Sequence, residues 1–129
     1  MAASEHAREL LRIAAEAADA KQGLDLVALD VSGPLPLTDI FFLVSGRNER
    51  NVLAIASEIE DRLFEAGTKP IRREGRSEGH WVLLDFGDLV VHVMHEEDRM
   101  YYSLERLWKD CPAVPLGLPA DRSVVEREA

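Results

Sequence analysis

The chain has 129 residues, of which 47% are hydrophobic and 30% are charged, and it carries a net charge of −9. This length and composition indicate one soluble globular domain, and they exclude a membrane protein because no apolar run approaches the ~20 residues that span a bilayer. The acidity disfavours direct nucleic-acid recognition, which depends on Lys and Arg, and favours encounter with a basic protein.

The first half of the chain predicts helix, strand, strand and helix, at residues 4–20, 24–31, 40–45 and 49–66. Both helices show apolar residues at helical spacing, the first behind an N-cap at Ser4 and the second before a C-cap at Gly67. The second strand, from Ile40 to Ser45, is almost entirely apolar, as expected of a strand that is covered on both faces. The loop between the strands contains two prolines and a glycine, which deny it regular structure.

The second half predicts three strands and a short helix, at residues 70–73, 80–86, 89–94 and 103–109. The two longer strands meet across Gly87-Asp88 and form a hairpin. The order is therefore α-β-β-α-β-β-β-α, which indicates an α/β fold with helices packed on a mixed sheet. We expect one domain over residues 1–112 and a flexible C-terminal tail over residues 113–129, where prolines and scattered charges replace periodicity.

The histidines and the single cysteine raise the question of a metal site. On a strand, side chains two residues apart share a face, so His92 and Met94 point one way while His95 points the other. Zinc needs three or four converging ligands, and Cys111 is distant in sequence. We therefore expect no metal and no cofactor, and interpret the histidines as structural or partner-facing. The lone cysteine cannot form an internal disulfide, which suits a reducing cytoplasm.

An alternative function, a nucleotide-binding enzyme, depends on carboxylates and one helix start. Asp85 and Asp88 could hold magnesium, and Asp30 or Asp39 would complete such a cluster. The helix start after Ser45-Gly46 could bind a phosphate group. The plainer interpretation is that a tight turn needs aspartate and glycine, since no phosphate-loop, dinucleotide or nucleophile motif accompanies them.

The aromatic residues are more informative. Trp81 shares one face of the first hairpin strand with Leu83 and Asp85, while Val82 and Leu84 lie on the other. One face must cover the core, and an apolar face left open needs a partner. Because tryptophan and tyrosine are frequent anchors of protein interfaces, we expect this hairpin to carry a binding surface.

Several blocks of sequence, in the same order, resemble the ribosomal silencing factor (Iojap-like) family. The strongest runs from Gly79 to Glu97, GHWVLLDFGDLVVHVMHEE, and RMYYSLERLW at residues 99–108 continues it. Upstream, LDVSG, TDIF, and SG followed by RNV also fit, so the match spans about residues 10–112. The sequence departs from the family pattern at Ile40, which lies outside the strongest block, and the pattern does not fix the tail.

The resemblance implies an α/β fold of nucleotidyltransferase-like shape without an established transferase activity, so we expect no enzyme. It implies a cytoplasmic translational repressor that binds the large ribosomal subunit through the subunit's fourteenth protein. Binding there blocks joining of the small subunit and lowers translation when nutrients are scarce. A third hypothesis, which comes from the apolar face and does not exclude the first, is self-association into a homodimer through that face. The residues that match the family's blocks, and that we expect to bind the partner, are Trp81, Leu83, Asp85, Asp88, His92, Tyr101, Tyr102 and Glu105.

Overall fold

The computed structural model describes the backbone of residues 3–102 and 104–118, and the side chains of residues 3–99 and 106–118. Its helices and strands follow the predicted order, with the last helical region divided into two short helices. They are α1 (Glu5–Ala20), β1 (Leu24–Asp30), β2 (Ile40–Gly46), α2 (Glu49–Glu65), β3 (Arg72–Glu74), β4 (Trp81–Asp85), β5 (Leu89–His95), α3 (Glu96–Tyr102) and α4 (Leu104–Leu107). None of the described helices is long and apolar enough to cross a membrane.

The strands form one mixed sheet in the spatial order β1-β2-β5-β4-β3. Strands β2 and β5 are parallel, from Ile40 opposite Leu89 to Gly46 opposite His95, and the other neighbours are antiparallel. A parallel pair needs a crossover connection, which α2, β3 and β4 supply here. The expected mixed sheet with helices packed on it is therefore confirmed.

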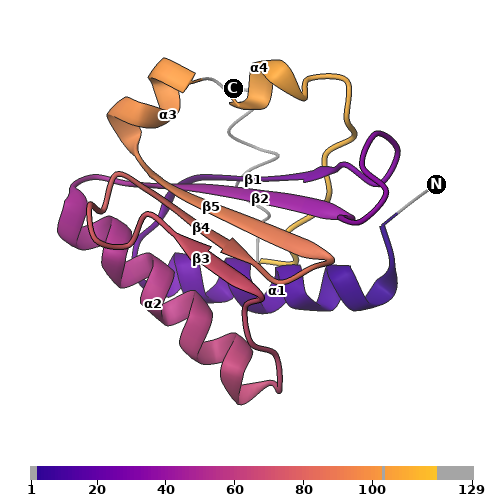
Figure 1. Cartoon of the computed structure of the whole chain (residues 1–129), viewed down its shortest axis with the longest axis horizontal. Helices are drawn as coiled ribbons and strands as arrows, with labels where there is room; N and C mark the ends of the chain where they lie inside the picture. Colours follow the sequence, from indigo (N-terminus) through magenta and orange to yellow (C-terminus); the bar gives the residue numbers. More distant parts are fainter. Residues whose placement is uncertain (1–2, 103, 119–129) are drawn as a thin grey trace.

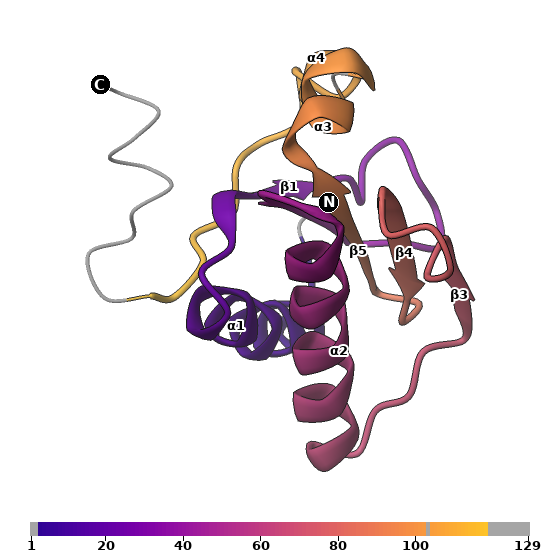
Figure 2. The ribbon, with the colours of Figure 1, turned by 90° about the vertical axis from the view of Figure 1, so that its left-hand side faces the viewer.

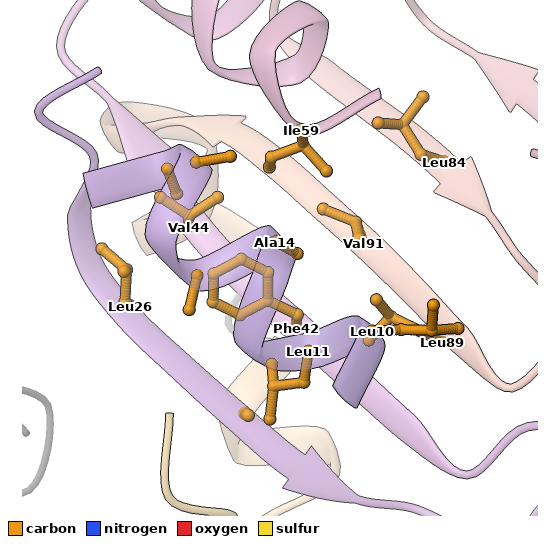
Figure 3. Packing of buried hydrophobic residues seen from close by; sticks show 14 of the residues in the cluster. Leu10, Leu11, Ala14, Leu26, Phe42, Val44, Ile59, Leu84, Leu89 and Val91 are labelled. Atoms are coloured by element: carbon orange, nitrogen blue, oxygen red, sulfur yellow. The ribbon is translucent and has the colours of Figure 1, made fainter. Parts of the chain in front are cut away.

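Helices α1 and α2 cover one face of the sheet (Figure 1). Ser4 caps α1 and Asn48 caps α2, each through a side-chain oxygen that accepts a backbone N–H three residues further on. Buried alanines on α1 let this helix approach its neighbours closely. The core between the helices and the sheet contains Phe42, Leu11 and Ile59, each at most 1% exposed (Figure 3). Burying one such side chain contributes roughly 1.5–3 kcal/mol to stability.

The opposite face of the sheet carries α3 and α4 over only part of its width. Helix α3 contacts β5 and β2, and Figure 2 shows β4 and β3 extending beyond the two short helices. Three acidic residues in the first turn of α3, Glu96 to Asp98, favour this helix because they offset its dipole. The sequence pattern did not predict α3, since seven residues are too few to show an apolar periodicity.

Residues 113–118, expected within a flexible tail, instead pack on the helix-side core. Val114, Leu116 and Leu118 are at most 8% exposed. The N–H of Val114 donates to the carbonyl of Ala28 at 2.9 Å, which attaches the segment to β1. The expectation was wrong for these six residues because prolines obscure an alternation of apolar side chains that is typical of an extended segment. Residues 119–129 of the expected tail lie outside the described residues.

Candidate partner-binding face

The hairpin of β4 and β5 turns one set of side chains away from α1 and α2. We call this set the open face, and its members pair across the two strands: Trp81 with Met94, Leu83 with His92, and Asp85 with Val90. The three β5 side chains are at most 7% exposed, whereas the three on β4 are half-buried. Val82 and Leu84 of β4 point into the helix-side core and are fully buried. Of the two faces that the hairpin offers, the Trp81 face is therefore the one left open.

Trp81 rests against His92, and the contact continues across the sheet. The indole Nε1–H of Trp81 donates to Nδ1 of His92 at 3.2 Å, and the two ring centroids lie 6.1 Å apart. His92 meets Phe41 of β2 edge-on at 5.0 Å, and Phe41 meets Trp108 edge-on at 5.3 Å. These four rings, which we call the aromatic row, run from β4 over β5 and β2 to the chain that follows α4.

His92 lies beneath the surface, with 6% of its area exposed. Burial lowers the pKa of its imidazole to about 4, because the charged form would lose its hydration. The ring is therefore neutral at pH 7. Since Nδ1 accepts the indole N–H, the proton is assigned to Nε2, which has no hydrogen-bond partner among the described residues. His92 therefore offers little surface of its own for the partner contact that we expect of it, and what it touches on this face is Trp81.

Asp85 and Asp88 both take part in the hairpin turn. Asp85 Oδ1 accepts the N–H of Gly87 at 2.9 Å. The backbone carbonyl of Asp88 accepts the N–H groups of Asp39 and Ile40, each at 3.0 Å. The carboxylate of Asp85 also lies 3.7 Å from the guanidinium of Arg72 on β3. The turn interpretation is confirmed for Asp85, whereas Asp88 lies in the turn and contributes its backbone carbonyl to the start of β2.

The same arrangement removes the basis of the enzyme alternative. Gly46 pairs with His95 at one end of β5, while Asp88 precedes Leu89 at the other end. The strand between them spans about 20 Å at 3.3 Å per residue, too far for one shared magnesium ion. Within the described part of the chain, no group of three or more His, Cys, Asp or Glu side chains is arranged to hold a metal ion. The convergence of Asp85 and Asp88 with the Ser45-Gly46 helix start, which the nucleotide-binding alternative required, was therefore wrong.

The start of α2 is already occupied by groups of this chain. The hydroxyl of Ser45 is buried and accepts a hydrogen bond from Nη1 of Arg99 at 3.1 Å. The N–H of Asn51, in the first turn of α2, donates to the side chain of Asn48 at 2.7 Å. These bonds occupy the Ser45 hydroxyl and the Asn51 N–H, two of the groups that a phosphate at this helix start could use.

Arg99 and His80 fix the position of α3 beside the open face. Arg99 is 7% exposed and joins α3 to β2 through Ser45. His80 lies between two carboxylates, with Nε2 3.0 Å from Glu49 and Nδ1 3.2 Å from Asp98. Sequence reasoning missed both roles, and the available signal was that both residues fall within the family blocks.

The arginines around β3 are held in ion pairs. Arg73 and Arg76 both reach Glu60 of α2, at 2.6 and 3.1 Å. Arg72 lies 3.3 Å from Glu74 of the same strand. These carboxylates offset part of the positive charge of the three arginines.

Three expected partner contacts follow the hairpin. Tyr101 and Tyr102 are the last two residues of α3, and Glu105 is the second residue of α4. Their side chains lie outside the described residues, so only their positions along the backbone are known.

A small acidic α/β domain with a half-buried tryptophan on an open sheet face has the features of a protein-binding domain. The model of one family, described as "Ribosomal silencing factor during starvation", matches residues 4–129. The chain belongs to this family.

Known relatives agree with this membership. The Ribosomal silencing factor RsfS of Bacillus subtilis is 44% identical over 109 residues, which cover 84% of this chain and 92% of the relative. A crystal structure from Bacillus halodurans matches with a TM-score of 0.74 and 42% identity, over 82% of this chain and 96% of that one. A structure of a Chromobacterium violaceum protein matches with a TM-score of 0.76 and 39% identity, over 78% and 84% of the two chains.

Proposed function

We propose that this protein binds the large ribosomal subunit through the subunit's fourteenth protein, using the open face around Trp81. Bound there, it blocks joining of the small subunit and lowers translation when nutrients are scarce. The observation that carries the proposal is the half-buried pair Trp81 and Leu83 on the open face of a chain of the ribosomal silencing factor family. Steric blocking needs an interface and no catalytic group, and the cytoplasm is where it would operate.

Exposed apolar side chains at one end of the hairpin support the proposal. Ile71 is 75% exposed, and its N–H donates to the carbonyl of Asp85 at 2.6 Å. Leu37 is 85% exposed in the loop that leads to Asp39, whose N–H bonds Asp88. An apolar surface with carboxylates beside it suits a basic protein, because opposite charges steer the encounter while apolar contact holds the complex.

The proposed contact residues fall into two groups. Trp81, Leu83, Asp85 and Asp88 belong to the hairpin itself, and Tyr101, Tyr102 and Glu105 follow on α3 and α4. His92 is buried beside Trp81 and contributes through its hydrogen bond to the indole.

The location of the interface can be tested by co-sedimentation with purified large subunits. Trp81→Ala should weaken binding at least about tenfold, because truncating an interface anchor costs about 2 kcal/mol or more. Phe64→Ala is a matched control, since it removes a 59% exposed aromatic ring at the end of α2, on the helix side. If the two variants bind equally, the interface lies elsewhere, and if the intact protein does not bind, the proposal fails.

The blocking step needs its own measurement. Light scattering follows the joining of purified large and small subunits as whole ribosomes form. The intact protein should lower the amplitude in proportion to the large subunits it occupies, and Trp81→Ala should not do so at the same concentration. Binding without any effect on joining would contradict the steric mechanism.

The open face also suits a second copy of this chain, so a homodimer is a competing occupant. Static light scattering of the free protein, repeated with Trp81→Ala, would reveal such a dimer as a loss of mass in the variant. Adding the ribosomal partner should then dissociate it, because one face cannot serve both.

A further inference from the structure

We infer that His92 is a positioning residue, whose imidazole holds the indole of Trp81 in the orientation that the partner meets. The inference rests on the proposed function and deepens it by naming the residue that shapes the contact. With 6% of its area exposed, His92 offers the partner little surface of its own. Its effect on binding would therefore pass through Trp81.

The hydrogen bond to His92 constrains the orientation of the indole of Trp81. A half-buried tryptophan on the outer side of a sheet can occupy several rotamers unless its surroundings select one. The bond from Nε1–H to Nδ1 of His92, at 3.2 Å, joins the polar edge of the indole to the neighbouring strand. Because a hydrogen bond weakens steeply with misalignment, this bond favours one ring orientation over the others.

The support itself is rigid. His92 lies on β5, which is paired on both sides, with β2 and with β4. Phe41 meets the imidazole edge-on at 5.0 Å and is in turn backed by Trp108 at 5.3 Å. Backbone pairing and the aromatic row thus hold Nδ1 in place from two directions.

A histidine at this position carries a cost that an apolar residue would not. Its Nε2 is buried without a partner among the described residues, and an unpaired buried polar group disfavours folding. Residues that lower stability within a well-paired strand are typical of functional sites. Here the compensating property is the acceptor at Nδ1, which is the atom that Trp81 uses.

Two substitutions of His92 distinguish the effect of its hydrogen-bond acceptor from the effect of filling the space of its ring. In His92→Asn the amide oxygen can stand near the position of Nδ1 and accept the indole N–H, whereas His92→Leu fills the site without an acceptor. The indole ¹H–¹⁵N resonance of Trp81, assigned by its absence in Trp81→Phe, should move in His92→Leu and stay nearer its original position in His92→Asn. Affinity for large subunits should fall about fivefold or more in His92→Leu, as for one lost hydrogen bond, and less in His92→Asn.

The outcomes distinguish this inference from the function it rests on. An indole resonance that His92→Leu leaves in place overturns the inference, as do equal losses of affinity in the two folded variants. If the unmodified protein does not bind large subunits, the proposed function fails, while the resonance still shows whether His92 positions Trp81. If the variants do not fold, ¹⁵N spectra of the unmodified imidazole decide, because a proton on Nδ1 would exclude the bond.

Discussion

At the residue scale, the buried imidazole of His92 makes folding depend on pH. Its pKa is about 4 in the folded protein and about 6.5 in an unfolded chain. Between these values the unfolded chain takes up a proton that the folded protein does not. Stability contributed by the neutral ring is therefore complete above pH 6.5 and falls as the pH falls towards 4.

This dependence can be measured against a variant that cannot titrate at the same position. The difference between 6.5 and about 4 corresponds to roughly 3 kcal/mol of unfolding free energy. Urea denaturation at several pH values should show the unmodified protein losing about that much more than His92→Asn on acidification from pH 7 to pH 4. Parallel losses in the two proteins would contradict a buried neutral histidine.

Asp30 illustrates how a candidate metal ligand becomes a structural anchor. Burial raises the pKa of its carboxyl, but bonds from Ser32 and from the N–H of Ala3, with the charge of Arg8, outweigh burial and lower it. The carboxylate is thus stabilised in the folded protein, and that contribution is lost as the pH falls through its lowered pKa. Its bond to Ala3, at 2.9 Å, fastens the segment before α1 to the end of β1.

At the element scale, the long helices and central strands could be predicted because each carries its own pattern. The caps of α1 and α2 and the apolar run of β2 need no knowledge of their neighbours. Short segments that are stabilised by distant contacts have no such local signal. Helix α3 depends on Arg99 reaching Ser45, 54 residues away, and residues 113–118 depend on β1.

The candidate site could likewise be predicted only where a single strand carries the signal. The alternation of side chains places Trp81 and Leu83 on one face of β4, but both faces of that strand are apolar. Which face stays open is decided by where α1 and α2 pack. The pairing of Trp81 with His92 depends on the register of β4 against β5, which their sequences do not specify.

The C-terminal segment offers a stability test of its packing. Leu116 is 1% exposed in the helix-side core, so Leu116→Ala should lower the unfolding free energy by about 2–5 kcal/mol. Pro115→Ala, at an exposed neighbouring position, should change it by about 1 kcal/mol or less, through the entropy of the unfolded chain. Chemical denaturation of both variants measures the difference. Equal effects would mean that the segment does not pack on the core in solution.

At the scale of the whole molecule, the edges of the sheet favour binding through a face. Residues 113–118 lie against β1 at one edge. At the other edge, β3 consists of Arg72, Arg73 and Glu74, and charged side chains on a short edge strand discourage pairing with another chain. We therefore expect a partner to bind the open face and not the sheet edges.

The net charge of −9 gives the proposed complex a dependence on salt. Attraction between an acidic domain and a basic ribosomal protein is screened as ionic strength rises, so affinity should decrease steadily with added KCl at constant magnesium. Trp81→Ala removes apolar contact and no charge, and should show the same slope at lower affinity. Co-sedimentation over a salt series checks both, and an affinity that does not respond to salt would contradict electrostatic steering.

The aromatic row also gives the protein a spectroscopic signal of its own. The chain has two tryptophans, and Trp81 and Trp108 are the two ends of that row. Their emission depends on how much water reaches them, so a partner that dries the open face should alter intrinsic fluorescence without any label. The substitution Trp108→Phe isolates the emission of Trp81. With a partner that lacks tryptophan, the change in that emission then measures directly how much of the open face is occupied.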